Sequence, residues 1–245
     1  MNFSSRFSNF YHFDTVSSTM EKAVRLIERG VSRGVVIADF QTGGYGRNGK
    51  SWFSPDNGNL YLSFFEKLDR DAPLDLIPQR TALSVLLTVE KFVNSELISL
   101  KWPNDILINN KKCSGIIAKS VQWNFERFYI GGIGINVFMP ETNLFKHTWE
   151  VGALSEYSQN IESKQVLTEL VKALDVFFEI ERGEVIKKYL SSISWMVSKK
   201  IAYTTSGSES KNGAVSGFND DGSVIKIREN SEISEMSAVS ILKIF

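Results

Sequence analysis

Hydrophobic positions recur every three to four residues in three stretches of the chain, which is the spacing of an amphipathic helix. Residues 18–28 form the first stretch, with a serine available as an N-terminal cap and Gly30 as a stop. Residues 76–95 and 164–181 carry longer runs of leucine, valine and phenylalanine at the same spacing. The pattern therefore predicts three helices, and a shorter fourth helix that follows through Leu190.

β-Branched and aromatic residues run together in short segments between these helices, as is typical of strands. The strands expected in the first part of the chain are residues 35–40, 59–65, 98–102, 106–108, 113–119 and 128–137. Short connections, among them an Asn109–Asn110 turn, favour antiparallel neighbours. The sequence thus predicts an α+β fold with a mixed, mostly antiparallel sheet flanked by helices.

Beyond residue 198 the pattern changes to short strands that are interrupted by Gly, Asn, Asp and Ser. They are expected at residues 201–204, 213–218, 223–228 and 238–244. Closely spaced strands of this kind predict a small β-barrel or sandwich. We expect a domain boundary near residue 196, which gives a larger domain of residues 1–196 and a small C-terminal domain of residues 197–245.

Composition narrows the classes of function. The 245 residues are 42% hydrophobic, and 28 basic residues balance 28 acidic ones, so no overall field attracts nucleic acid or membranes. One cysteine rules out an internal disulfide, and two histidines make a zinc site built by the protein unfavourable. No apolar run approaches the roughly 18 residues that span a bilayer, and no signal peptide is evident. We therefore expect a soluble, cytoplasmic protein.

A glycine-rich loop matches the P-loop pattern of nucleotide triphosphatases from Gly44 to Ser51. A P-loop needs a helix that begins at its lysine, whereas Pro55 and Asn57-Gly58 oppose a helix here. We therefore reject a true P-loop. Glycines that let the backbone approach a ligand, with the charges of Arg47 and Lys50, still favour an anion-binding loop. A flexible surface loop is the plainer interpretation, and the loop alone does not decide between the two.

Four segments carry further chemistry, namely Ser18-Thr19-Met20, Gln41 through Pro55, Lys101-Trp102-Pro103-Asn104-Asp105 with Lys112 and Gly115-Ile116, and Gly132-Ile133-Gly134-Ile135-Asn136. Together, in this order and spacing, they resemble the biotin–protein ligase family over roughly residues 12–156. The segment from Lys101 to Asp105, with a lysine seven residues later, is highly specific, whereas the last segment is weak alone. The resemblance implies the class II synthetase-like biotin ligase fold with an SH3-like C-terminal barrel.

The resemblance also implies an activity. Family members make biotinyl-5′-AMP from biotin and magnesium–ATP, and then transfer biotin to a lysine of a biotin carboxyl carrier protein of a biotin-dependent carboxylase. A carboxylate that attacks a phosphate brings two anions together, so fixed cations must offset the repulsion. The resemblance assigns catalytic roles to Lys112, Arg47 and Asp105. From the cysteine and histidine count we expect no metal site built by the protein, and the magnesium that accompanies ATP could lie near Asp105. Asn104 and Asp105 could organise that lysine or magnesium, and Asp105 could deprotonate the acceptor amine.

Biotin's ureido ring is an uncharged donor and acceptor, which hydroxyl, amide and main-chain groups can bind. By resemblance, the biotin site consists of Ser18, Thr19, Gln41, Gly44, Gly46, Lys112, Gly115, Gly132 and Gly134. The ATP or adenylate site consists of Arg47, Asn48, Lys50, Trp52, Asn104, Lys112 and Asn136. Plainer interpretations stand beside these: Ser18 and Thr19 as helix caps, Trp52 and Trp102 as core residues, and Lys101 as an exposed strand lysine.

One residue departs from the usual pattern of the family, and other functions therefore stay possible. Tyr45 stands where the family usually has an arginine, which removes one phosphate-facing guanidinium and makes a catalytically impaired biotin-binding module an alternative. A lipoate–protein ligase or acyltransferase of the same fold is another, although Gln41 and the segment from Lys101 to Asp105 argue against it.

The partners expected from the sequence are biotin, ATP and the carrier protein. About ten residues precede the region of resemblance, too few for the DNA-binding domain of bifunctional relatives, so we expect a short form that binds neither DNA nor a membrane. The sequence leaves open whether the protein is a monomer or a homodimer.

Overall fold

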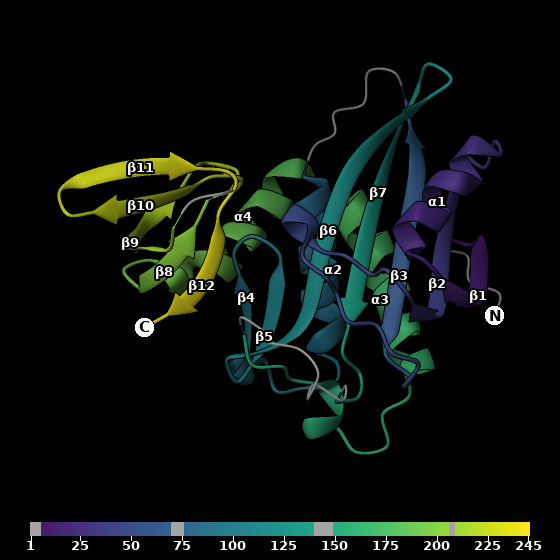
Figure 1. Cartoon of the computed structure of the whole chain (residues 1–245), viewed down its shortest axis with the longest axis horizontal. Helices are drawn as coiled ribbons and strands as arrows, with labels where there is room; N and C mark the ends of the chain where they lie inside the picture. Colours follow the sequence, from purple (N-terminus) through teal and green to yellow (C-terminus); the bar gives the residue numbers. More distant parts are fainter. Residues whose placement is uncertain (1–5, 70–75, 140–148, 206–208) are drawn as a thin grey trace.

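The computed structural model describes residues 6–69, 76–139, 149–205 and 209–245. Its centre is a seven-stranded sheet in the order β1-β2-β3-β7-β6-β5-β4 (Figure 1). The strands are β1 (Phe10–Val16), β2 (Arg33–Gln41), β3 (Leu60–Leu68), β4 (Ile98–Lys101), β5 (Asp105–Ile108), β6 (Lys111–Trp123) and β7 (Glu126–Ile135). β1 and β2 pair in parallel and the other neighbours pair antiparallel, which confirms the predicted mixed, mostly antiparallel sheet.

The strand boundaries follow the sequence with one omission. The turn between β5 and β6 is confirmed, since Asn109 and Asn110 adopt φ angles of 48° and 64°. β1 is missing from the predicted strands because most of its residues are exposed or only partly buried, so it lacks a clear apolar run. This strand lies at one edge of the sheet, where a single neighbour, β2, holds it.

Helices cover both faces of this sheet (Figure 1). They are α1 (Thr19–Glu28), α2 (Ile77–Val89), α3 (Ser163–Glu179) and α4 (Arg182–Ile193). α1 covers one face and begins at Ser18, whose hydroxyl accepts the N–H of Met20 at 3.2 Å, so the N-cap prediction is confirmed. α2 and α3 pack on the other face, and α4 contacts α2 and β4. Within the described residues no helix is long and apolar enough to cross a membrane.

The helix predicted over residues 76–95 is wrong at its C-terminal end. α2 ends at Val89, and the side chain of Asn94 accepts the N–H of Glu96 to begin a separate short 3-10 turn, Ser95–Leu97. Periodicity alone does not detect this break, because Phe92 and Val93 still pack against the core beyond the end of the helix.

A second, antiparallel sheet follows the helices, in the order β11-β10-β9-β8-β12. Its strands are β8 (Lys200–Thr204), β9 (Lys211–Phe218), β10 (Ile225–Glu229), β11 (Glu232–Met236) and β12 (Ser240–Ile244). β11 was not predicted, because three of its five residues are polar and none is buried. Among residues 200–205 and 209–245, no pairing between β11 and β12 closes the sheet into a barrel. The domain boundary near residue 196 stays a prediction.

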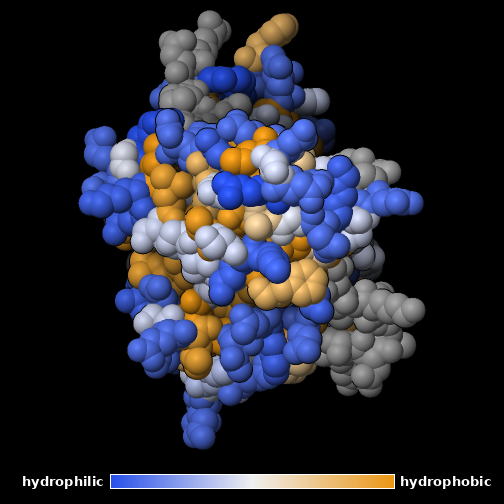
Figure 2. Space-filling model, turned by 90° about the vertical axis from the view of Figure 1, so that its left-hand side faces the viewer, coloured by the Kyte–Doolittle hydropathy of each residue, from blue (hydrophilic) through white to orange (hydrophobic). Residues whose placement is uncertain are grey.

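Two tryptophan side chains hydrogen-bond the larger domain to the region of the second sheet. The side chain of Trp102 is fully buried, as its core interpretation predicted, and its Nε1 donates to the carbonyl of Gly222 at 2.8 Å. The indole of Trp149 donates to the carbonyl of Ile241 at 3.1 Å. Figure 2 shows the face on the side of the second sheet, where hydrophobic side chains lie between hydrophilic ones, and Ile233 and Phe245 are among the exposed hydrophobic residues. The two sheets therefore share one continuous core.

Candidate active site

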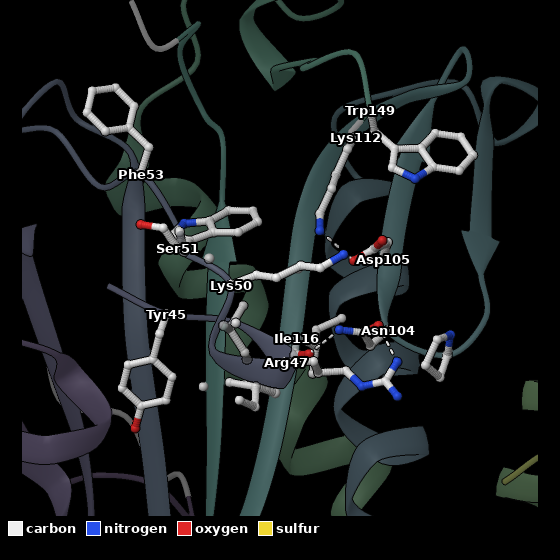
Figure 3. A pocket seen from close by; sticks show the side chains of 18 of the residues that line it. Tyr45, Arg47, Lys50, Ser51, Phe53, Asn104, Asp105, Lys112, Ile116 and Trp149 are labelled. Atoms are coloured by element: carbon white, nitrogen blue, oxygen red, sulfur yellow. Dashed lines mark hydrogen bonds and ion pairs between the residues drawn. The ribbon is translucent and has the colours of Figure 1, made fainter. Parts of the chain in front are cut away.

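A cavity of about 520 Å³ lies where the glycine-rich loop, the turn between β4 and β5, and the ends of β6 and β7 meet. The interpretation from sequence requires Arg47 and Lys112 to share one cavity, and both line this one (Figure 3). The other predicted residues in its wall are Ser18, Thr19, Gln41, Gly46, Lys50, Trp52, Asn104, Asp105, Gly115, Gly132, Gly134 and Asn136. Gly44 and Asn48 lie outside the lining. A volume of this size is typical of small-molecule sites.

The glycine-rich loop does not form a P-loop. Residues Arg47–Gly49 make a single 3-10 turn in which Asn48 has a φ of 56°, and the chain after Lys50 continues without a helix to β3. Tyr45 and Ser51 form an antiparallel bridge, so the loop folds back on itself. The rejection of a P-loop is therefore confirmed, and the turn directs Arg47 into the cavity while Asn48 donates to the hydroxyl of Ser240 at 3.4 Å.

Arg47 is partly buried against the turn that follows β4. Its Nη1 donates to Oδ1 of Asn104 at 3.4 Å, and Nδ2 of Asn104 donates to the carbonyl of Ile116 at 2.6 Å. Burial lowers the pKa of the Arg47 guanidinium, although the charge of Asp105 opposes this effect. Arginine stays protonated even so. Arg47 is therefore a fixed cation that Asn104 orients toward the cavity.

Asp105 forms the charged centre of the site. Its Oδ1 lies 2.7 Å from Nζ of Lys112, and its Oδ2 lies 2.7 Å from Nζ of Lys101. Burial alone would raise the pKa of this carboxyl, but the two lysines outweigh burial and hold the pKa well below its usual range. Asp105 is therefore ionised, and it bridges two ammonium groups.

Lys101 is a site residue that the sequence interpretation missed. The expectation of an exposed strand lysine is wrong, because Lys101 is only 4% exposed and its Nζ lies 4.0 Å from the ring centroid of Trp149. Burial lowers the pKa of this lysine, and the charge of Asp105 opposes that shift. The available signal was its position between the apolar Leu100 and Trp102, four residues before Asp105.

The opposite end of the cavity holds a chain of uncharged polar groups. Oε1 of Gln41 accepts the N–H of Thr19 at 2.8 Å and its hydroxyl at 3.2 Å, and Nε2 donates to the hydroxyl of Ser54 at 2.8 Å. The buried hydroxyl of Ser63 donates to Oγ1 of Thr19 at 2.8 Å. These bonds fix the orientation of the Gln41 amide and use both lone pairs of its Oε1. Nε2 of Gln41 keeps a second hydrogen, and Oγ1 of Thr19 keeps a second lone pair, for an uncharged ligand. Ser18 uses its own hydroxyl as the helix cap.

Glycines of β6 and β7 make room for protein side chains at the floor of the cavity. A Cβ atom at Gly134 would lie 2.5 Å from Cε2 and Nε1 of Trp52, and one at Gly115 would lie 2.7 Å from Cζ3 of the same ring. A Cβ at Gly132 would lie 2.8 Å from the sulfur of Met20. Nε1 of Trp52 is buried without a hydrogen-bond partner among the described residues. The indole of Trp52 therefore packs directly on the glycines, next to the cavity, with its N–H buried.

Adding a methyl group at Gly134 should displace Trp52. We expect Gly134→Ala to lower the free energy of unfolding by about 1–3 kcal/mol, as overpacking usually does, and to change the tryptophan emission spectrum. Urea denaturation followed by fluorescence measures both. The matched control is Gly183→Ala, because a Cβ at Gly183 meets nothing within 4 Å. A Gly134→Ala protein with unchanged stability and emission would contradict this account of the cavity floor.

Asn136 holds the strand that carries Lys112. Its Nδ2 donates to the carbonyl of Gly152 at 3.1 Å and to that of Lys112 at 3.4 Å, and its N–H donates to the carbonyl of Cys113 at 2.8 Å. The N–H of Lys112 in turn donates to the carbonyl of Glu150 at 2.7 Å. Although Asn136 lines the cavity, its amide nitrogen is already bonded to the backbone, and we infer that it positions Lys112.

Tyr45, which replaces the usual arginine, does not point at the charged centre. Its side chain packs partly on the smaller core cluster between α1 and the sheet, and Figure 3 shows it directed away from Lys112 and Asp105. Arg47, Lys50 and Lys112 remain as cations in the wall. The substitution therefore leaves the positive charge around Asp105 in place.

Asp105 is poorly suited to bind magnesium in this arrangement. Mg²⁺ prefers carboxylate oxygens that are free of other cations, whereas both oxygens of Asp105 contact ammonium groups and Arg47 lies in the same wall. No group of three or more His, Cys, Asp or Glu side chains suited to a metal ion occurs in the described part of the chain. We therefore assign no metal ion to Asp105.

Comparison with known proteins identifies the class. A model of the Biotin/lipoate A/B protein ligase family matches residues 12–136, more than half of the chain, and every predicted site residue falls within them. The chain belongs to this family. It is 39% identical over 131 residues to the Bifunctional ligase/repressor BirA of Bacillus subtilis. The matched residues cover 52% of this chain and 39% of that protein.

Other relatives are consistent with this membership. The chain is 31% identical over 140 residues to the Biotin--[acetyl-CoA-carboxylase] ligase of Mycobacterium tuberculosis, which is 53% of this chain and 51% of that protein. It thus spans about two fifths to one half of the length of these two curated relatives.

Among solved structures, a biotin protein ligase from Aquifex aeolicus in complex with biotin and ATP covers 96% of this chain and 99% of its own. That match has 29% identity and a TM-score of 0.73. It includes both sheets, which confirms the predicted biotin ligase fold.

Proposed function

We propose that this protein is an ATP-dependent biotin–protein ligase. In the proposed reaction, the biotin carboxylate attacks the α-phosphate of ATP, which gives biotinyl-5′-AMP and releases pyrophosphate. An acceptor lysine then attacks the acyl carbon, so that a C–N bond forms while the C–O bond to AMP breaks. One observation carries the proposal. In this member of the family, the same cavity has a fixed amide and hydroxyl network at one end and the cations Arg47 and Lys112 at the other.

The first step needs cations where two anions meet. Arg47 and Lys112 reach the cavity from different elements, the glycine-rich loop and β6, so they can hold a carboxylate and a phosphate against each other. Lys50 adds a third charge from the loop. Gln41 and Thr19, whose orientation is fixed by their hydrogen bonds, are the groups that we assign to the ureido ring.

In the second step we assign an electrostatic role to Asp105. A carboxylate whose pKa is held this low is a weak base, so Asp105 is a poor acceptor for the proton of the incoming amine. Its assignment here is to hold Lys112, which polarises the acyl carbon of the adenylate. We expect magnesium to enter with the phosphates of ATP, the acceptor to be a biotin carboxyl carrier protein, and the reaction to take place in the cytoplasm.

Biotin-dependent exchange of labelled pyrophosphate into ATP measures the first step, and transfer of biotin to a purified carrier domain measures the second. We expect the purified protein to do both. Lipoate serves as the comparison substrate, since lipoate-dependent exchange without biotin-dependent exchange would favour a lipoate–protein ligase. Biotin binding by calorimetry without any exchange would favour the impaired binding module, and neither binding nor exchange would refute the proposal altogether.

A further inference from the structure

Lys101 occupies a position that is costly for a lysine. Its side chain is 5% exposed, it pairs directly across β4 and β5 with Asp105, and the ring of Trp149 covers its ammonium group. A buried ammonium is retained only when its charge is paired, and lysine is rarely buried at all. The side chain is also not long enough to bring this ammonium group into solvent, where it would be hydrated. The location therefore calls for a role that depends on the charge.

The two lysines at Asp105 differ in their freedom to move. Both lysines line the cavity, but the side chain of Lys112 is 27% exposed, whereas that of Lys101 is 5% exposed and lies between Asp105 and Trp149. Nζ of Lys112 approaches Oδ1 of Asp105 to 2.7 Å, yet among the described residues this oxygen has no partner with the angles of a hydrogen bond. The ion pair of Lys112 is the more exposed of the two, so Lys112 can turn to a ligand while Lys101 stays.

We propose that Lys101 is a positioning residue that keeps Asp105 paired when Lys112 turns to an anionic ligand. This inference rests on the proposed function, in which Lys112 contacts a carboxylate and a phosphate. One carboxylate serves two ammonium groups, so Lys112 can leave without exposing a buried, unpaired charge. Without Lys101, an incoming anion would have to take Lys112 from a carboxylate that has no other counter-charge, and the binding of that anion would weaken.

The test uses inorganic pyrophosphate as the probe, because its binding needs an anion site but no biotin. We expect Lys101→Met to weaken pyrophosphate binding by on the order of 100-fold in isothermal titration. Adding Asp105→Asn to Lys101→Met should restore most of this loss, since no carboxylate then competes for Lys112. A purely structural role for Lys101 predicts the opposite, because the second substitution would add further damage.

Two further variants keep the test decisive if Lys101→Met alone does not fold. In the Asp105→Asn background, Lys101→Met should change pyrophosphate affinity less than about threefold, which is under 0.7 kcal/mol. Lys111→Met is the matched control, because this lysine lies on β6, beside the strand that carries Asp105, pairs with Glu156 and does not line the cavity. A loss of about tenfold or more from Lys101→Met within the Asp105→Asn background would overturn the inference, and this outcome needs no Lys101→Met protein in the wild-type background.

The outcome separates this inference from the proposed function. A wild-type protein that binds pyrophosphate but forms no biotinyl-5′-AMP contradicts the proposed function, while the comparison of the Lys101 variants retains its meaning. A wild-type protein that does not bind pyrophosphate at millimolar concentration overturns the inference itself, because Lys112 would then have no anion to turn to.

Discussion

Lys112→Ala should reduce the rate of biotin-dependent pyrophosphate exchange by about 100- to 1,000-fold, with little change in stability. Removal of one preorganised donor from a charged transition state usually costs this much. Lys112 reaches the cavity with a partly exposed side chain, so its loss creates no void in the core. Exchange kinetics measure the rate, and thermal unfolding tests whether the fold is retained.

The adjacent lysine supplies the control for this prediction. Lys111→Ala removes the same charge from the same strand, but Lys111 pairs with Glu156 at the surface, outside the cavity. We expect its exchange rate to stay within about twofold of the wild type, as is usual for exposed ion pairs. A Lys112→Ala protein as active as Lys111→Ala would refute the role that we assign to Lys112.

Asp105→Asn should lower the free energy of unfolding by about 3–5 kcal/mol, because it leaves two ammonium groups without their shared counter-charge. Urea denaturation at pH 7 measures this loss. Asp14→Asn is the control, since Asp14 is exposed on β1. Equal stability of the two variants would show that the charges around Asp105 are solvated rather than buried.

The same variant also tests how the contribution of Asp105 to the free energy of unfolding depends on pH. The pKa of Asp105 is lowered in the folded state relative to its usual 3.8, so its ionised form stabilises the fold above that value. This stabilisation is lost as the pH falls through the lower pKa of the folded state, where the carboxyl is protonated. We therefore expect the difference between wild type and Asp105→Asn to be constant from pH 7 to pH 5 and to shrink only below about pH 4. A difference that vanished already at pH 5 would contradict the lowered pKa.

Local patterns in the sequence were sufficient to predict most of the fold. Apolar spacing located four helices, and the turn signal at Asn109–Asn110 fixed the pairing of β5 with β6, which brings Lys112 close to Asp105. The strands that the sequence did not predict are those with few buried side chains. β1 and β11 expose many of their side chains, so hydrogen bonds to a neighbouring strand define them more than an apolar run does.

The site was predictable where a motif places residues close in sequence, and unpredictable where distant segments meet. Asn104, Asp105 and Lys112 were named from sequence and lie together in the cavity. Burial of Lys101 depends on Trp149, which no local pattern links to it. The contribution of residues 239–241 to the cavity wall likewise depends on how the second sheet packs. The roles of these residues in binding stay predictions until the variants are measured.

The docking of β12 has a consequence for the order in which the cavity is completed. Ribosomes add about 5–20 residues per second, so the segment with Lys112 emerges several seconds before Ile241 does. Until then, Trp149 cannot donate its hydrogen bond to the carbonyl of Ile241, and Asn48 of the glycine-rich loop cannot donate to the hydroxyl of Ser240. A nascent chain can therefore carry all the charged groups of the site while one wall is still missing, and the cavity is complete only after Ser240 and Ile241 have emerged.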